Sequence, residues 1–348
     1  MSRELILAAS WQRMDSKMSP IVFIQQDMRP RIHWSEVMTP QDQFISRLYR
    51  STQQVSISHF RDWALKELQS LIHFDSAIWS TGHLSTRSFH THTALGLPQS
   101  FTENLIDSIQ INPITKHLYQ HLGEAIDMAD VIDDSTFYNS DIYQAVFKPN
   151  KIERILSSVH INQRSGIYTL LSIYRSNRVN FFTDEEKKTH QSSIYHLIES
   201  ASHSCMLSLN TGNDTLSSHA ICDNHGMYHE VDPSFLDLVD EIVPNKKSQC
   251  LPFELPEIGK NELINNVLIT TEKLGDLFRV NLRNATPLDR LTKREAEVVN
   301  GVTQGMSFKQ IAKRLDRSPS TVSNHLYRIY QKLNINNRSE LADLIQNK

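Results

Sequence analysis

The sequence predicts an α+β fold with three parts: an antiparallel sheet with helices, a small strand-rich unit, and an all-α C-terminal domain of four helices. Three observations lead to this prediction. Runs of β-branched and aromatic residues alternate with helical spacing as far as residue 209. A polar segment, 211–218, then precedes a second set of short strands. Beyond residue 290, four helix-start signals follow one another at short intervals.

Length and composition place the chain among globular proteins. It has 348 residues, of which 39% are apolar and 22% charged, which is long enough for two or three domains of ~100–200 residues. No apolar run approaches the ~20 residues of a membrane helix, and Leu5–Ala9 is too short for the core of a signal peptide. We therefore expect a cytoplasmic protein with no membrane partner.

The distribution of charge separates the C-terminal tail from the rest. The net charge of the whole chain is −3. Residues 286–348 carry 11 basic and 6 acidic side chains, a net charge of +5, whereas residues 1–285 carry 25 and 33, a net charge of −8. A basic tail on an acidic body is typical of a small nucleic-acid-binding module attached to a larger domain that does not bind nucleic acid.

Cysteine and histidine spacing does not indicate a metal site. Cys205, Cys222 and Cys250 are odd in number and lack CxxC spacing, which disfavours a disulfide framework or a thiolate zinc site. The histidine pairs with ligand-like spacing lack further ligands that would complete a site. These pairs are His90 and His92, His117 and His121, and His225 and His229 near Asp223. We predict no metal and no cofactor.

Residues 1–41 are predicted to be an N-terminal arm, because prolines interrupt them and they lack a clear period. Residues 42–210 form the first domain. Its expected elements are a helix with apolar residues from Phe60 to Ile72, strands at Ser76–Ser80 and Ser88–Ala94, helices at Ser100–Ile109, Pro113–Leu122 and Asp141–Phe147, and strands at Ile155–Ile161 and Ile167–Arg175.

A long helix should close this domain. Thr183 and Glu186 have the spacing of a capping box, so the helix begins after Thr183 and runs to about Leu209. Its predicted buried residues are Ile194, Leu197, Ile198, Ala201 and Met206.

Residues 219–285 predict a smaller unit. His219–Cys222 and Met227–Val231, joined by a turn at 223–226, have the pattern of a β-hairpin. A short helix at Pro233–Val239 and strands at Val267–Thr271 and Leu277–Leu282 complete this unit.

The C-terminal domain, residues 286–348, contains four helix starts. Three of them are residue pairs with capping-box spacing: Thr292 and Glu295, Ser307 and Gln310, and Asn337 and Glu340. The fourth is Ser318, with Pro319 at the first helical position. Only Asp316 and Arg317 separate the second helix from the cap of the third, and so short a turn is typical of a helix-turn-helix.

The third helix of this domain has an apolar and a polar face. Apolar side chains recur at i, i+4, i+7 and i+11 and should pack against the first two helices; they are Val322, Leu326, Ile329 and Leu333. The opposite face has hydrogen-bonding side chains without a carboxylate: Ser320, Ser323, Asn324, Tyr327 and Arg328. Such a face fits the major groove of duplex DNA, and an ordinary solvated face is the plainer alternative.

The tail resembles the LuxR/GerE-type helix-turn-helix of bacterial regulators. The shared pattern includes Leu-Thr-x-Arg-Glu-x-Glu-Val at 291–298, Ile311-Ala312, Ser318-x-x-Thr321-Val322-x-x-His325 and Asn337-Arg338-x-Glu340-Leu341. The resemblance covers about 57 residues and implies a four-helix domain, DNA binding by the third helix and dimerisation through the fourth. Many members have lysine where this chain has Ser323, which weakens any transfer of base preference.

Two classes of DNA contact are predicted for individual side chains. Ser323, Asn324, Tyr327 and Arg328 are candidates for base edges, and the amide of Asn324 suits adenine. The side chains expected to hold phosphates are Lys293, Lys309, Ser320, Thr321 and Lys332. His325 lies between the two faces, where it either contacts DNA or is a packed, hydrogen-bonded residue.

The first domain resembles GAF-like sensor domains in short motifs, among them Phe74-Asp75-Ser76-Ala77-x-Trp79 and Phe182-Thr183-x-Glu185-Glu186. Residues 219–285 resemble a shortened PAS-like fold through Cys222-Asp223-x-x-Gly226. These resemblances imply antiparallel sheets with helices, which enclose a pocket or form a dimer face. Six aromatic residues could line a pocket for an unknown small molecule or belong to the core: Trp79, Phe89, Tyr143, Phe147, Tyr168 and Tyr174.

Other classes of protein fit the sequence less well. Residues 1–130 lack the alternation of parallel strands and helices of a receiver domain, and no Gly-x-Ser-x-Gly, P-loop or Gly-x-Gly-x-x-Gly motif indicates an enzyme. We predict a homodimeric transcription regulator that binds a palindromic operator in double-stranded DNA. The alternative is an interaction protein or co-regulator that binds DNA weakly and without sequence preference.

Overall fold

The computed structural model describes residues 38–209, 217–244 and 249–346. Its first sheet contains β1 (Ser76–His83), β2 (Ser88–Leu95), β3 (Ile126–Asp127), β4 (Arg154–Ile161) and β5 (Ile167–Arg175). The strands lie in the order β2-β1-β5-β4-β3, and every neighbouring pair is antiparallel. The prediction of an antiparallel sheet with helices is confirmed for this part, which we call the large unit (residues 39–209).

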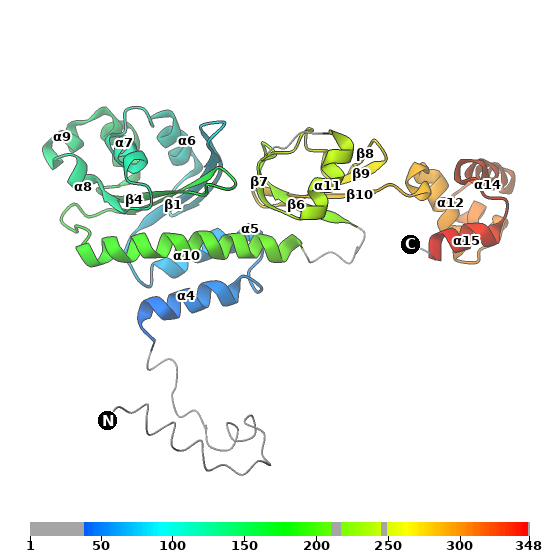
Figure 1. The fold of residues 1–348 in the computed structure, drawn as a ribbon, viewed down its shortest axis with the longest axis horizontal. Coiled ribbons are helices and arrows are strands. Elements are labelled where there is room, and N and C mark those ends of the chain that lie inside the picture. The colour runs from blue at the N-terminus through cyan, green and yellow to red at the C-terminus, as the bar shows by residue number, and fades with distance from the viewer. Residues whose placement is uncertain (1–37, 210–216, 245–248, 347–348) are drawn as a thin grey trace, which may run out of the picture.

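Helices cover both faces of this sheet (Figure 1). One face packs against α4 (Pro40–Ser51), α5 (Ile57–Leu68) and α10 (Asp184–Leu209). The other face is covered by α6 (Gln99–Asp107), α7 (Pro113–Gln120), α8 (Met128–Val131), α9 (Asp134–Asn139), a π-helical segment (Tyr143–Phe147) and a 3-10 turn (Lys148–Asn150).

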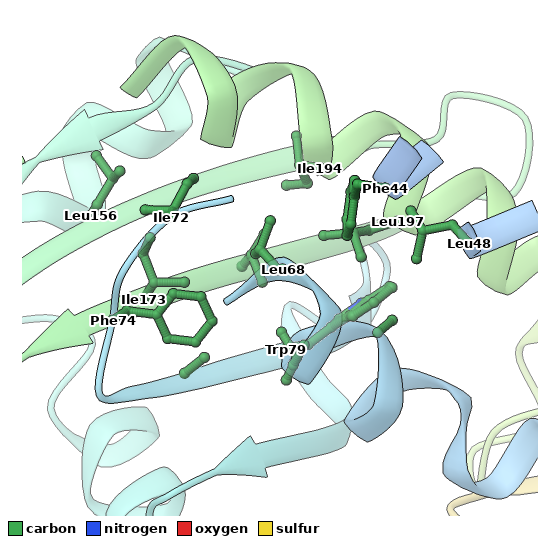
Figure 2. Close-up of a cluster of buried hydrophobic side chains, with 14 of the residues drawn as sticks. Phe44, Leu48, Leu68, Ile72, Phe74, Trp79, Leu156, Ile173, Ile194 and Leu197 are labelled. Carbon is green, nitrogen blue, oxygen red and sulfur yellow. The ribbon is translucent and has the colours of Figure 1, made fainter. Parts of the chain in front are cut away.

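Side-chain alternation along the strands divides the large unit into two cores. Because successive residues of a strand point to opposite faces, Trp79 and Ile173 face α5 and α10, whereas Ile78 and Tyr174 face α6 and α7. Figure 2 shows the first core, in which apolar side chains of three helices meet the sheet. These side chains include Phe44 and Leu48 of α4, Leu68 of α5, and Ile194 and Leu197 of α10.

The end of α10 differs from its predicted buried face. Ile194 and Leu197 are buried as predicted, but Met206 is 55% exposed, so its predicted burial is wrong. The last turns of the helix leave the large sheet and meet a second unit. The side chains buried at that contact are Cys205 and Leu209 of α10 together with Ile221 and Leu277.

Other departures concern short elements. The segment predicted as an α-helix at Asp141–Phe147 is π-helical from Tyr143 onwards. The two residues of β3 were not predicted as a strand. The predicted arm, 1–41, lies mostly outside the described residues, but α4 already begins at Pro40.

The small unit, residues 217–284, contains a second sheet. Its strands lie in the order β7-β6-β10-β9-β8, all antiparallel. The elements are β6 (Ser218–Cys222), β7 (Tyr228–Val231), α11 (Pro233–Ile242), β8 (Asn261–Ile264), β9 (Val267–Leu274) and β10 (Leu277–Asn284). The predicted hairpin, helix and later strands are confirmed, and β8 is an addition. The predicted boundary at 211–218 lies mainly outside the described residues.

The C-terminal domain follows β10 at the end of the molecule opposite the large unit (Figure 1). A 3-10 turn, η3 (Pro287–Arg290), leads into α12 (Lys293–Thr303), α13 (Phe308–Arg314), α14 (Pro319–Leu333) and α15 (Arg338–Gln346). These are the four predicted helices. None of the helices in the described ranges has the length and apolar character that crossing a membrane requires.

Candidate nucleic-acid interface

Side-chain caps start all four helices of the C-terminal domain. Each cap oxygen accepts a hydrogen bond from a backbone N–H that has no partner inside its own helix. The distances are 3.3 Å from Glu295 N to Thr292, 3.4 Å from Gln310 N to Ser307, 3.1 Å from Thr321 N to Ser318 and 2.9 Å from Glu340 N to Asn337. The four predicted helix starts are therefore confirmed.

Two local features bring the first three helices close together. A Cβ at Gly301 of α12 would lie 2.8 Å from Ile311 of α13, so glycine permits this close approach. In the turn after α13, Asp316 has a φ of 52°, and Arg317 N donates to the carbonyl of Ala312 at 2.9 Å. This short turn directs the chain into α14.

The two faces of α14 are as predicted. Its apolar side chains are buried against residues of α12 and α13, such as Val298 and Ile311. This packing turns the opposite face outwards. Exposed on that face are Ser320, Ser323, Asn324, Tyr327 and Arg328.

The exposed side chains differ in their partners. Tyr327 is 64% exposed, and its hydroxyl accepts a hydrogen bond from Gln331 Nε2 at 2.8 Å. Ser320 and Thr321 surround the cap of the helix, with their hydroxyl oxygens 2.7 and 2.8 Å from Ser318 Oγ. Within the described ranges, the side chains of Asn324 and Arg328 make no hydrogen bond or ion pair, so a ligand can engage all their polar atoms.

The three predicted phosphate-binding lysines have different surroundings. Lys293 and Lys309 are exposed near the starts of α12 and α13. Lys332 Nζ instead donates to Glu295 Oε2 at 2.7 Å and so ties α14 to α12. Burial alone would raise the pKa of Glu295, but hydrogen bonds from Lys332 and Thr292 outweigh it and lower that pKa. Lys332 is thus engaged within the domain.

His325 is half-buried on α14. Its ring makes no hydrogen bond with the part of the chain that the structure describes. The alternative, a packed and hydrogen-bonded histidine, is therefore only half met, because the ring is packed but not hydrogen-bonded. Its ring nitrogens are available to a ligand.

Two further cations, not predicted as DNA contacts, lie near the start of α14. Lys313 and Arg317 are exposed, and neither side chain pairs with another described residue. Their position at the helix-turn-helix turn was the available signal, since exposed cations beside a recognition helix suit phosphate contacts.

The large unit encloses a small apolar cavity between its sheet and the α6 and α7 side. Its volume is about 50 Å³. Of the six aromatic residues considered above, those that line it are Phe89, Phe147 and Tyr174. Tyr143 and Tyr168 pack in the same core without lining the cavity, and Trp79 belongs to the opposite face. Three of the six therefore line this cavity, and the other three are core residues, as the alternative stated.

Histidines noted separately in the sequence meet between the large and small units. His90 Nδ1 lies 2.5 Å from Asp223 Oδ2, and the ring centre of His90 is 4.1 Å from that of His225. His229 Nε2 is 3.9 Å from the same Asp223 oxygen. No group of three or more metal-ligating side chains suited to an ion occurs in the described ranges. These histidines connect the two units.

Comparison with known families decides the identity of the C-terminal domain. Residues 289–345 match the model of the bacterial regulatory proteins of the luxR family. This domain is a LuxR-type helix-turn-helix.

Curated relatives of the chain match it over short lengths. The chain is 31% identical to the HTH-type transcriptional regulator MalT of Vibrio campbellii over 110 residues, which is 32% of this chain and 10% of MalT. It is 46% identical to the transcriptional regulatory protein UhpA of Escherichia coli over 54 residues, 16% of this chain and 28% of UhpA. The chain thus spans less than a third of the length of either relative.

Solved structures resemble the chain only distantly. The crystal structure of Escherichia coli SdiA has a TM-score of 0.37 and 12% identity, covering 87% of this chain and 95% of that one. SdiA in complex with octanoyl-rac-glycerol has a TM-score of 0.35, also at 12% identity, over 90% of this chain and 94% of that one. These similarities are too low to define the folds of the large and small units, which are described by their own strand orders.

Proposed function

We propose that this protein is a sequence-specific DNA-binding transcription regulator, not an enzyme, and that it acts in the cytoplasm as a homodimer. The observation that supports this most is the exposed face of α14. It presents hydrogen-bonding side chains and one guanidinium, has no carboxylate, and belongs to a LuxR-type domain. A face of this kind can enter the major groove without repelling phosphates.

In this proposal, α14 reads the bases. Asn324 and Arg328 contact base edges through side chains that have no partner in the described residues, with Asn324 suited to adenine and Arg328 to guanine. Ser323 and Tyr327 lie on the same face and add contacts. His325, at the edge of this face, contacts a base or a phosphate.

The phosphate contacts come from side chains around this helix. Lys293, Lys309, Ser320 and Thr321 hold the DNA backbone, together with Lys313 and Arg317. Lys332 contributes a contact only if a phosphate shares it with Glu295. Such contacts supply affinity and salt dependence but no sequence preference.

Dimerisation through α15 would give the complex two-fold symmetry. Two copies of α14 would then lie about one helical turn of DNA apart, ~34 Å, and read a palindromic operator. The large unit would regulate this binding by accepting a small apolar molecule in the cavity between its sheet and α6 and α7.

The proposal is tested by selecting genomic DNA fragments with the purified full chain at two salt concentrations. A palindromic motif that persists at the higher salt is expected. Binding without a motif that is lost at higher salt would contradict the proposal and favour the co-regulator alternative.

Variants then test the recognition face on the selected motif. Arg328→Ala and Asn324→Ala should each weaken specific binding about 10-fold or more, because a good bidentate base contact is worth ~1–3 kcal/mol. Asn261→Ala, which removes an exposed amide on β8 of the small unit, outside the C-terminal domain, is the control and should retain affinity. Unchanged affinity of both Arg328→Ala and Asn324→Ala, with normal folding, would exclude this face as the reader.

A further inference from the structure

A second cavity lies where the large and small units meet. Its volume is about 80 Å³. The large unit contributes the ends of α5 and α10 and the face of the sheet that carries Trp79. The small unit closes it with β7 and the turn between β9 and β10. This cavity is on the opposite side of the large sheet from the apolar cavity, and unlike that cavity it is lined by charged side chains.

The formal charges of the lining are divided between the two units. The large unit contributes one cation, Arg61, and no carboxylate. The small unit contributes two carboxylates, Glu230 and Asp276, and no lysine or arginine. Burial lowers the pKa of His229, the remaining small-unit polar residue of the lining, so this ring is neutral at pH 7. A ligand in the cavity would therefore meet donors on one side and acceptors on the other.

On the large-unit side, hydrogen-bond donors are unused. Trp79 is 2% exposed, and its indole Nε1 is buried with no hydrogen-bond partner among the described residues. The guanidinium of Arg61 lies 5.9 Å from the centre of the same ring. Its Nη1 donates to Thr91 at 2.7 Å and to Asp276 at 3.3 Å, whereas Nε and Nη2 donate to no described residue. A buried unpaired N–H is costly, and a ligand acceptor would remove that cost.

On the small-unit side, carboxylate oxygens are unused. Glu230 accepts one hydrogen bond, from Ser202 of α10, and forms no ion pair with a described residue. Burial raises the pKa of Glu230, as expected for a carboxylate that lacks a cation. Asp276 uses one oxygen toward Arg61. An ammonium group between these two carboxylates would supply the missing positive charge.

We propose that this cavity binds a small α-amino acid, whose carboxylate accepts hydrogen bonds from Trp79 and Arg61 and whose ammonium group donates to Glu230 and Asp276. The volume suits the smallest members, glycine, alanine and serine, because a cavity of ~150 Å³ holds a molecule as large as benzene. Since its two charged ends engage different units, the ligand holds the small unit against the large one. It binds at a place separate from the apolar cavity.

The experiment is a titration of the full-length protein labelled with ¹⁵N at its tryptophan indoles. The Trp79 signal is identified as the one that disappears in Trp79→Phe. Glycine, L-alanine and L-serine should shift this signal to saturation. Acetate and methylamine each carry only one of the two charged groups, and at equal concentration they should shift it much less.

Variants test the two ends of the site by calorimetric titration. Trp79→Phe keeps the packed ring but removes the donor, and Glu230→Gln keeps the shape but removes the charge. Each should weaken amino-acid binding about 10-fold or more, because each removes a hydrogen bond or an ion pair to a charged group of the ligand. The matched control is Glu272→Gln on β9, which removes an exposed carboxylate outside the cavity. It should leave the affinity unchanged.

Three results would overturn the proposal. The first is a Trp79 signal that none of the amino acids moves. The second is acetate or methylamine binding as tightly as glycine, which would mean that only one charged end is recognised. The third is wild-type affinity in Glu230→Gln, and this variant remains informative if Trp79→Phe fails to fold. None of these results depends on DNA binding.

Discussion

The large and small units have sheets of the same topology. Numbered in chain order within each unit, the strands of both sheets lie in the order second, first, fifth, fourth, third. Both sheets also end alike. Arg175 of β5 bonds to Glu186 in the capping box of α10, and Arg283 of β10 bonds to Asp289 in the capping box of η3. In each unit, an arginine of the last strand therefore anchors the start of the next helix.

The difference lies in what covers each sheet. The large unit has helices of its own on both faces, and α6 and α7 leave a cavity of about 50 Å³. In the small unit, α11 packs on one face with Phe235, Val239 and Ile242 buried. Its other face rests on the end of α10. The same strand order thus leaves a cavity beside the sheet of the large unit, whereas the sheet of the small unit is covered on one face by a helix of the large unit.

The largest expected effect is a difference in stability between variants of the two anchoring arginines, Arg175 and Arg283. Arg175 is 2% exposed and also donates to the carbonyls of His73 and Phe181 at 2.8 and 2.7 Å. Arg175→Met removes the donor to these carbonyls and the cation beside Glu186, which keeps only its hydrogen bonds from Thr183. It should lower the free energy of unfolding by about 3–5 kcal/mol. Arg283→Met, at an arginine that is 16% exposed, should cost less, about 2 kcal/mol. Urea unfolding measures both, and equal losses would mean that the two anchors are equivalent.

The dependence of the small unit on α10 predicts the next effect. Ile221 is fully buried in the contact between β6 and the end of α10. Ile221→Ala should cost ~3 kcal/mol through lost burial and a cavity. Proteolysis should then cleave the small unit before the large one. Leu263→Ala, at a side chain that is 48% exposed, is the control. Simultaneous cleavage of both units would show that they unfold as one.

A matched pair of substitutions tests whether the large unit has space beside its sheet that the small unit lacks. Val239 of α11 is buried in the core of the small unit and lines neither of the two cavities, so Val239→Trp should destabilise the protein by about 1–3 kcal/mol or more. Leu105 lines the cavity of the large unit, so Leu105→Trp can enter that space and should cost less than about 1 kcal/mol. Thermal unfolding compares the two. A greater loss in Leu105→Trp would mean that the cavity cannot accept a ring.

The smallest expected effect is the pH dependence of the stability that Asp289, just after β10, contributes. Hydrogen bonds from Arg283, at 2.7 Å to each carboxylate oxygen, lower the pKa of Asp289. A carboxylate with a lowered folded-state pKa contributes stability above its unfolded pKa of ~4 and loses it as pH falls towards the folded value. Asp289→Asn should therefore cost about 1 kcal/mol at pH 7 and progressively less in acid. Unfolding measured across this pH range checks it, and a pH-independent cost would contradict it.

Local sequence signals predicted the C-terminal domain well because its structure depends on neighbours along the chain. Each helix start requires a cap and a backbone N–H three residues later, and both are visible in the sequence. The strand Ile167–Arg175 was predicted with correct ends, since its β-branched and aromatic residues lie between turn signals. The exposed reading face of α14 followed from the spacing of its apolar residues alone.

Contacts between distant segments were not predictable in this way. The two residues of β3 are a strand only because they pair with β4. Lys332 was predicted to hold a phosphate, and its ion pair with Glu295, distant in sequence, was not predicted. Met206 has the spacing of a buried residue, yet the partner of α10 changes beside it, and Cys205 and Leu209 are buried instead.

The sequence by itself determined the α+β class, the helix-turn-helix and the side chains that α14 exposes, because caps, turns and periodicity act over a few residues. Only the tertiary structure decided which faces of the two sheets are covered, and by what. It brought Trp79 and Arg61 opposite Glu230 and Asp276, residues far apart in the chain. The meeting of such side chains depends on how whole units pack, and no pattern within one segment encodes it.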